Sequence, residues 1–251
     1  MMLVVDMGNT RIKWSMVHGR VLKAVYAVRH GGDIKALFDH PSWHQLPRPE
    51  RLVVSNVLGA SFAAGLSAWV ADCWSREVEY VSVAERGFGI LHCYHDISRL
   101  GVDRWVNMVA VHQHRAGASC ICDCGTALTI DFLTAEGRHQ GGLILPGLEM
   151  MRKALSADAR AIDLGAEYDK ASTLSLYARD TTGAVMKGTL YTLVAAIARI
   201  VADAQMQTAE TLNVIITGGD AARLLPLLGD DYEYQPDLVL QGLAVIAAAS
   251  K

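Results

Sequence analysis

Two short segments of the sequence place an aspartate, a glycine and a hydroxyl residue at the end of an apolar run. Residues 6–10 are Asp-Met-Gly-Asn-Thr and residues 123–126 are Asp-Cys-Gly-Thr. A tight turn of this composition points successive backbone N–H groups at one spot and binds phosphate oxygens without basic side chains. The aspartate ahead of each turn can hold a cation or its waters, because hard cations take oxygen ligands. Two such turns could clamp one triphosphate.

The two motifs indicate an internal duplication. A single Asp-x-Gly-x-Thr is more often an ordinary hairpin turn. Here Asp6 and Asp123 lie 117 residues apart, each at the end of a first strand that two more strands follow. A period of nearly half the chain means two copies of one fold rather than a solenoid of short repeats. We therefore expect an α/β protein with lobes at residues 1–117 and 118–251 and an active-site cleft between them.

Two further segments could complete a phosphotransfer site. Residues 215–220, Ile-Ile-Thr-Gly-Gly-Asp, end a strand in two glycines before a helix, which suits an adenosine seat or a plain strand-to-helix turn. Gly101-Val102-Asp103-Arg104 opens a predicted helix. Asp103 either caps that helix or accepts the proton of a substrate hydroxyl beside Arg104, which would stabilise transferred charge.

The elements that must position these residues follow from apolar periodicity and turn residues. We expect strands at 2–6, 11–17, 21–28, 52–56, 78–83, 120–123, 127–133, 139–145 and 213–217. We expect helices near 34–38 and at 61–74, 104–115, 148–155, 172–205, 220–228 and 237–249. Segment 40–51 holds three of the six prolines and is predicted to be a loop.

Composition bounds the class of protein. The 251 residues are 51% hydrophobic and 20% charged, which is typical of a compact enzyme and not of a disordered or fibrous chain. A net charge of −3 gives no field that would gather nucleic acid or an anionic membrane. The first residues carry no basic leader, and Arg199 and Asp203 interrupt the most apolar segment, 189–204, so we expect a cytoplasmic protein with a buried helix there.

Cysteines and histidines offer no metal motif. Cys120, Cys122 and Cys124 share one face of a strand, which suits small buried thiols rather than a zinc clip or a disulfide framework and indicates a reducing compartment. The nine histidines do not converge with carboxylates in a metal-binding pattern, so we interpret them as structural or solvated.

Taken together and in order, the motifs resemble the type III pantothenate kinases of the actin-like ATPase superfamily. The matching segments span nearly the whole chain and include Asp6-x-Gly-Asn-Thr-x-x-Lys13, Gly101-Val-Asp-Arg104, Asp123-x-Gly-Thr126, Gly141-Gly-x-Ile-x-Pro-Gly147 followed by Ala154-Leu155, and Thr217-Gly-Gly219. The resemblance implies two tandem ribonuclease-H-like lobes with mixed five-stranded sheets flanked by helices. It also implies ATP-dependent phosphorylation of pantothenate, the first step of coenzyme A biosynthesis, by a homodimer.

The same resemblance assigns residues. It implies that Asp103 is the catalytic base and that Asp123 holds a monovalent cation, K⁺ or NH₄⁺, used beside Mg²⁺ with ATP. The implied ATP-binding residues are Asp6, Met7, Gly8, Asn9, Thr10, Arg11, Ile12, Lys13 and Thr126. The implied pantothenate-binding residues are Tyr94, Gly101, Val102, Asp103, Arg104 and Thr181, with Thr182 as an alternative to Thr181. Lys187 departs from the small residue common in the family, which bears on the acceptor pocket near the subunit interface.

Two other functions fit the same scaffold. A nucleotide-gated binding or regulatory module would need a client domain and would have no use for an acceptor pocket at 101–104. The residues alone do not distinguish a phosphatase or a different small-molecule kinase from a pantothenate kinase, and only the family resemblance separates them.

Overall fold

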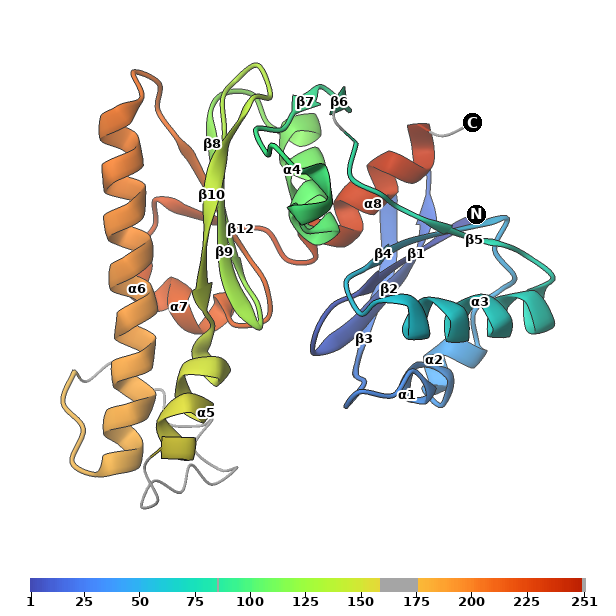
Figure 1. The fold of residues 1–251 in the computed structure, drawn as a ribbon, viewed down its shortest axis with the longest axis horizontal. Coiled ribbons are helices and arrows are strands. Elements are labelled where there is room, and N and C mark those ends of the chain that lie inside the picture. The colour runs from blue at the N-terminus through green and yellow to red at the C-terminus, as the bar shows by residue number, and fades with distance from the viewer. Residues whose placement is uncertain (85, 159–175, 250–251) are drawn as a thin grey trace. The chain divides into compact units, whose positions relative to one another are not determined.

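The computed structural model describes residues 1–84, 86–158 and 176–249, which form two compact units (Figure 1). The first unit contains Met1–Ala116, Leu133–Gly141 and Asp237–Lys251, and the second contains Gly117–Phe132 and Gly142–Pro236. The chain first passes between units next to the expected lobe boundary at 117/118. The grouping differs from one cut there, because the tip of a hairpin and the C-terminal helix pack within the first unit.

The first unit is built on a five-stranded sheet. Its strands are β1 (Met2–Met7), β2 (Arg11–His18), β3 (Val21–Arg29), β4 (Arg51–Asn56) and β5 (Val78–Tyr80), in the order β3-β2-β1-β4-β5. The first three strands form an antiparallel meander, and β4 and β5 continue the sheet in parallel. Apolar residues fill both faces of β1, and Asp6, one residue before the end of the strand, is only partly buried.

The second unit repeats this sheet. Its strands are β8 (Ser119–Cys124), β9 (Ala127–Leu133), β10 (His139–Pro146), β11 (Asn213–Thr217) and β12 (Tyr232–Tyr234), in the order β10-β9-β8-β11-β12. The register repeats as well, since Asp6 lies opposite Ser55 on β4 and Asp123 lies opposite Thr217 on β11. The predicted duplication and the mixed five-stranded sheets are confirmed.

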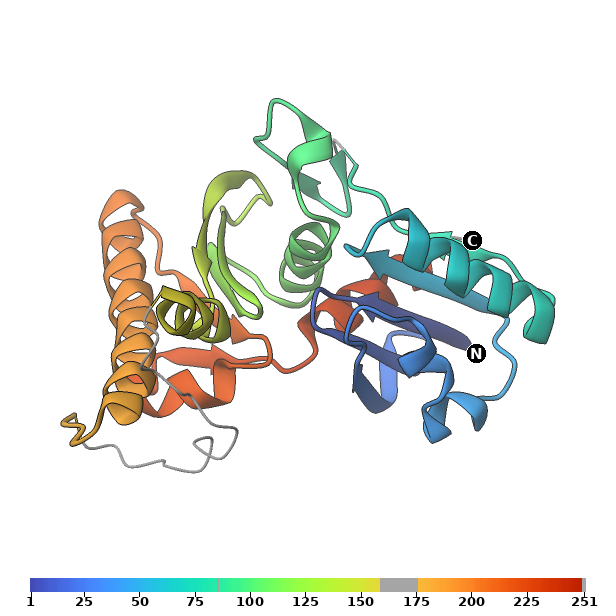
Figure 2. The same ribbon diagram turned by 60° about the horizontal axis from the view of Figure 1, so that its bottom comes forward.

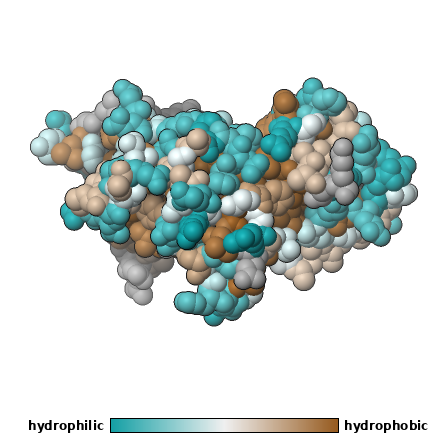
Figure 3. Space-filling view, turned by 90° about the horizontal axis from the view of Figure 1, so that it is seen from above, coloured by the Kyte–Doolittle hydropathy of each residue, from teal (hydrophilic) through white to brown (hydrophobic). Residues whose placement is uncertain are grey.

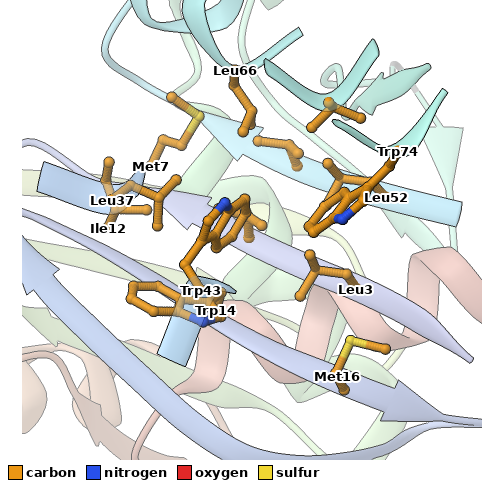
Figure 4. Packing of buried hydrophobic residues seen from close by; sticks show 13 residues of the cluster. Leu3, Met7, Ile12, Trp14, Met16, Leu37, Trp43, Leu52, Leu66 and Trp74 are labelled. Carbon is orange, nitrogen blue, oxygen red and sulfur yellow. The ribbon is translucent and has the colours of Figure 1, made fainter. Parts of the chain in front are cut away.

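One face of the first sheet packs against three helices, α1 (Lys35–Phe38), α2 (Pro41–His44) and α3 (Ala60–Trp74). Figure 4 shows Trp14, Trp43 and Trp74 among the aliphatic side chains of this core. The prediction of a loop at 40–51 is wrong for its first residues. His40 caps α2 through Nδ1, which accepts the Ser42 N–H at 3.2 Å, and Pro41 suits the first helical turn. The short helix buries Trp43 completely.

Two helices from distant parts of the chain pack beyond the other face of the first sheet, α8 (Leu238–Ala249) against the strands and α4 (Val102–His114) against α8 (Figure 2). A Cβ on Gly242 would lie 2.2 Å from the Val106 carbonyl oxygen, so only glycine allows this approach. Arg51 ties the end of α8 to the sheet, because Nη1 donates to the Ala247 carbonyl at 2.8 Å while the same guanidinium pairs with Glu79. These contacts explain why the C-terminal helix belongs to the first unit.

In the second unit, α5 (Leu148–Asp158), α6 (Thr181–Gln207) and α7 (Ala221–Leu228) accompany the sheet. Cys120, Cys122 and Cys124 are buried, unbridged and part of one core cluster with α6 and α7, which confirms the prediction of small buried thiols. Burial raises the pKa of the Cys124 thiol, and the charge of Asp123 adds to this. The thiol beside Asp123 therefore stays protonated at neutral pH.

Helix α6 differs from its prediction. It begins at Thr181, and the predicted start at 172 lies outside the described residues. Only 17% of its most apolar window is buried, so the prediction of a buried helix is wrong. Its length and composition would allow it to cross a membrane, but a single helix of this kind is weak evidence for a span. On the face in Figure 3, hydrophilic residues are interspersed with small apolar patches.

Short elements between the main ones escaped prediction. The segment after β5 forms a small hairpin, β6 (Arg86–Gly87) and β7 (Ile90–Leu91), and then a 3₁₀ turn, η1 (Ile97–Arg99). The predicted strand 78–83 ends at Tyr80, and the edge strand β12 was not expected. Strands of two or three residues carry too few side chains to show an alternation.

Candidate active site

The turn after β1 is closed by the main chain. The Gly8 N–H donates to the Arg11 carbonyl at 3.1 Å, and a Cβ on Gly8 would lie 3.2 Å from that oxygen and 3.6 Å from Asp6 Oδ2. Met7 and Ile12 are fully buried in the core, whereas Asn9, Thr10 and Arg11 are exposed. Within residues 6–13, Met7 and Ile12 can therefore meet a ligand only through their backbone atoms.

The turn after β8 has the same design. The Gly125 N–H donates to the Ala127 carbonyl at 3.1 Å, and a Cβ on Gly125 would lie 3.5 Å from Asp123 Oδ1. In both turns the aspartate side chain thus lies close to the glycine two residues later. The sequence motif reflects a shared geometry, in which a Cβ on the glycine would be in ordinary van der Waals contact with the carboxylate.

Two other glycine motifs pack against the second turn. A Cβ on Gly218 would lie 2.6 Å from Asp123 Oδ1 and 2.5 Å from the Cys124 carbonyl oxygen. A Cβ on Gly147 would lie 2.4 Å from the Thr126 carbonyl oxygen, to which the Gly147 N–H donates at 3.2 Å. The Asp-x-Gly-Thr, Pro-Gly and Gly-Gly segments are therefore one local structure, with Asp123 and Thr126 at its centre.

A histidine supports the first turn. His30 is 8% exposed, its Nδ1 accepts the Gly32 N–H at 3.0 Å, and its Nε2 lies 3.2 Å from the Gly8 carbonyl oxygen. Because Nδ1 is an acceptor, the neutral ring carries its proton on Nε2 and donates it to Gly8. The Phe62 ring packs edge-on against the His30 ring, with 5.1 Å between the ring centroids. His30 thus fixes the carbonyl at the centre of the turn.

Lys13 lies opposite Asp6 across the β1–β2 pair. Its ammonium binds Asp237 Oδ1 at 2.9 Å, with the two side chains about a quarter exposed. Asp237 has a positive φ of 57° and directly precedes α8. The Lys13 ammonium group therefore lies beside the end of β1 and contacts Asp237, the residue at which the chain re-enters the first unit.

The predicted acceptor residues cluster at the start of α4. Asp103 is the second residue of the helix, and its Oδ1 accepts the Arg104 N–H at 2.8 Å. A Cβ on Gly101 would lie 2.5 Å from that oxygen, so glycine leaves room for the carboxylate. Arg104 is 4% exposed and donates from Nη1 to the Tyr94 hydroxyl at 2.8 Å. Tyr94, Gly101, Asp103 and Arg104 thus come together, with Val102 as the first residue of the helix.

Thr181 lies in the second unit, on the wall of a pocket of about 760 Å³ between α5 and α6. The lining residues are Pro146, Met150, Met151, Ala154, Leu155, Thr181, Ala184, Val185, Gly188, Thr189 and Thr192. Asp180 caps α6 by accepting the Gly183 N–H at 2.7 Å, which sets the position of Thr181 as the first helical residue. Beneath the pocket, burial lowers the pKa of Arg152, whose Nε donates to Thr189 at 3.2 Å.

Comparison with known proteins identifies the family. The family model for type III pantothenate kinase matches residues 2–203. The chain belongs to the type III pantothenate kinase family. A type III pantothenate kinase of Nitrosococcus oceani is 42% identical over 253 residues, covering 98% of this chain and 94% of the relative. One of Alcanivorax borkumensis is 35% identical and covers 99% of both chains.

Solved structures with low identity support the fold alone. An activator of 2-hydroxyisocaproyl-CoA dehydratase from Clostridium difficile, solved with bound ADPNP, matches 98% of this chain with a TM-score of 0.54 and 14% identity. The ethanolamine utilization protein EutJ of Carboxydothermus hydrogenoformans matches 97% with a TM-score of 0.53 and 15% identity. The type III pantothenate kinase chain therefore has the expected actin-like ATPase fold.

Two histidines near these residues were not singled out from the sequence. His30 contacts Gly8, and His139 stacks on Tyr94 at a centroid distance of 5.9 Å. Both were grouped with the structural histidines, because partners 22 and 45 residues away leave no local pattern. The only local signal is the pair of glycines that follows each of them, directly after His30 and one residue later after His139.

We predict that His30→Ala loosens the first turn. The variant removes the donor to Gly8 and the acceptor of Gly32 from a buried site, which should lower the free energy of unfolding by about 2 kcal/mol. Hydrogen exchange of the amides of residues 7–10 should become faster, as measured by mass spectrometry of the covering peptide. His18→Ala, at the exposed end of β2, serves as the control and should leave this exchange unchanged. Unchanged exchange in His30→Ala would contradict the assigned support.

Proposed function

We infer that this type III pantothenate kinase transfers the γ-phosphoryl group of ATP to the primary hydroxyl of pantothenate. The product, 4′-phosphopantothenate, begins coenzyme A biosynthesis. The observation that carries this function is the family match over residues 2–203, together with relatives that align over nearly their whole length.

ATP is proposed to be held by the two hairpin turns of the repeated fold. Residues 6–13 would contact phosphate mainly through main-chain N–H groups, with the exposed Thr10 and Arg11 adding side-chain donors. Lys13 would reach phosphate by leaving Asp237, a change available to a flexible side chain that is about a quarter exposed. Thr126 would contact ATP from the second turn.

Asp103 is proposed as the base that accepts the proton of the pantothenate hydroxyl. A carboxylate at a helix N-terminus stays ionised, and late proton removal is sufficient for a loose phosphoryl transition state. Tyr94, Gly101, Val102 and Arg104 would bind the acceptor, with Arg104 placed to stabilise transferred charge. Thr181 would add a contact from the pocket wall that it lines. The contact between Asp103 and the Arg104 N–H also fits a purely structural cap, which an asparagine substitution can separate from catalysis.

Asp123 is proposed to bind the monovalent cation, K⁺ or NH₄⁺, and Mg²⁺ is proposed to enter with ATP. The Asp123 carboxylate and the Cys124 carbonyl, which also accepts the Asp220 N–H at 2.9 Å, both lie close to Gly218, so oxygen atoms of the kind that K⁺ prefers as ligands meet at this turn. No group of three or more His, Cys, Asp or Glu side chains suited to a metal occurs in the described part of the chain. A bound cation would supply positive charge beside the phosphates and would need carbonyl, water or phosphate oxygens as additional ligands.

The chain is proposed to work as a cytoplasmic homodimer without nucleic acid or membrane partners. Helix α6 supports the dimer. Exposed small residues follow one side of it, at Ala184, Gly188, Thr192, Ala195 and Ala202, and the first three also line the pocket beside α5. The neighbouring surface is apolar too, since Ile144 on the edge strand β10 is 64% exposed and Met150 on α5 is 46% exposed. A second copy would cover this surface, and five unbridged cysteines fit a reducing compartment.

Other activities on the same fold remain the competing hypotheses. A regulatory nucleotide switch would hydrolyse or bind ATP without an acceptor. A phosphatase or a kinase for another alcohol would give no ADP that depends on pantothenate. ADP release with pantothenate as the sole added acceptor therefore separates all three from the proposed function.

We predict that Asp103→Asn lowers pantothenate-dependent ADP release by about 10²–10⁴-fold while ATP affinity stays close to that of the wild type. The amide keeps an oxygen that can accept the Arg104 N–H, so the cap survives while the base is lost. A coupled assay gives turnover, and calorimetry gives ATP binding. Asp96→Asn, which alters an exposed carboxylate that caps η1, is the control and should retain turnover. Equal loss of binding and turnover would assign Asp103 a structural role only.

We predict that replacing K⁺ by Na⁺ at constant ionic strength lowers the rate about tenfold, the effect of losing roughly one charge-assisted contact. Asp123→Asn should have a low rate in both salts. The initial rate of ADP release is measured in each salt for both proteins. A wild-type rate that is the same in K⁺ and Na⁺ would argue against a selective monovalent site.

We predict that Ala195→Arg converts the dimer to a monomer, because a charged side chain on the small-residue side of α6 would be buried unpaired in the interface. Sedimentation velocity gives the mass of each species. Ala71→Arg, at an exposed alanine of α3 in the first unit, is the matched control and should remain dimeric. A dimeric Ala195→Arg protein would place the interface elsewhere.

A further inference from the structure

His139 belongs to the second sheet by sequence but lies among the acceptor residues of the first unit. It is the first residue of β10 and is 3% exposed. Its ring stacks on Tyr94 with an interplanar angle of 19°, and its Nδ1 lies 3.7 Å from Cys93 Sγ. The buried imidazole therefore supports one face of an aromatic ring that is itself partly exposed.

The backbone fixes this contact. The Leu91 N–H donates to the Gly137 carbonyl at 3.0 Å, and Leu91 forms a parallel bridge with Arg138. Gly137 has a positive φ of 78°, and a Cβ there would lie 2.2 Å from the Gly89 carbonyl oxygen. Only glycine permits this approach, which sets the register that brings His139 beside Cys93 and Tyr94.

Tyr94 in turn contacts Arg104 at the start of α4. Its hydroxyl accepts from Arg104 Nη1 at 2.8 Å, and the guanidinium carbon lies 5.6 Å from the centroid of its ring. Arg104 is nearly buried, and its backbone N–H binds Asp103 Oδ1. A series of contacts therefore runs from His139 through Tyr94 to Arg104 and the carboxylate proposed as the base.

We propose that His139 is a positioning residue for the acceptor site, acting by holding the Tyr94 ring in the orientation that Arg104 and pantothenate require. This inference rests on the proposed function. The stack limits rotation of Tyr94 about its side-chain bonds, so less ordering is left for the acceptor to impose when it binds. Removal of the stack should therefore weaken acceptor binding and leave the ATP turns unaffected.

The experiment compares His139→Ala with His139→Phe in steady-state kinetics. His139→Ala should raise the KM for pantothenate about three- to tenfold, the size of effect expected from one aromatic pair. The KM for ATP should stay within about twofold of the wild type. His139→Phe keeps a planar ring and should restore the KM for pantothenate to within about twofold of the wild type. Equal KM values in the alanine and phenylalanine variants would overturn the stacking role.

A double-mutant cycle separates positioning from general loss of structure. If His139 acts through Tyr94, His139→Ala should add no further increase in KM when introduced into Tyr94→Ala. An increase of the same size in both backgrounds would overturn the proposal, because the effect would then bypass Tyr94. Gly137→Ala tests the same contact from the backbone and should raise the KM for pantothenate as His139→Ala does; an unchanged value would count against the register described above.

Wild-type controls keep the two hypotheses apart. A wild-type protein that releases no pantothenate-dependent ADP would reject the proposed function itself. A wild-type protein that does so, with an unchanged KM in His139→Ala, would reject only the role of His139. The intrinsic fluorescence and unfolding midpoint of each variant are recorded, and the phenylalanine variant carries the test if the alanine variant fails to fold.

Discussion

The structure depends on close approach between main-chain segments that only glycine allows. The clearest case is the turn at residues 123–126, where Gly147 contacts the Thr126 carbonyl and Gly218 contacts Asp123 and Cys124. A single Cβ at either position would lie within 2.6 Å of an oxygen atom. Three segments spread over nearly a hundred residues therefore converge because each contributes a residue without a side chain. The glycines of the Pro-Gly and Gly-Gly segments are thus packing requirements.

The two copies of the fold meet this requirement differently. Around the second turn the supporting groups are main chain, through Gly147 and Gly218. The first turn, besides its own main-chain hydrogen bond, is supported by a side chain, His30, which donates to the Gly8 carbonyl. The duplicated strand order thus carries two local environments, in keeping with separate tasks for the two copies.

Much of the architecture could be predicted because local patterns of apolar and turn residues determine it. Eight of the predicted strands have five or more residues and lie within a few residues of their predicted bounds, since apolar runs and turn residues mark them. The repeat could be predicted because Asp6 and Asp123 end equivalent strands. Helix α2 could not be predicted, because its four residues lie in a proline-rich segment. The helix is stabilised by the packing of Trp43 against Trp14, which is distant in sequence. The exposure of α6 likewise depends on what surrounds it, which an apolar sequence does not reveal.

The candidate site likewise contains some residues that the sequence could predict and others that it could not. Asp103 and Arg104 are neighbours in sequence, so their proximity needed no structure, and Gly101 follows from the room that the carboxylate requires. The groups that hold them in place lie elsewhere in the sequence. Tyr94 lies in the loop before α4, and His139 lies on a strand of the second sheet, next to the bridge between Arg138 and Leu91. Residues that contact a ligand can recur as a motif, because their spacing is set by chemistry. Residues that position them are set by packing across the fold, so they become visible only when distant segments are seen side by side.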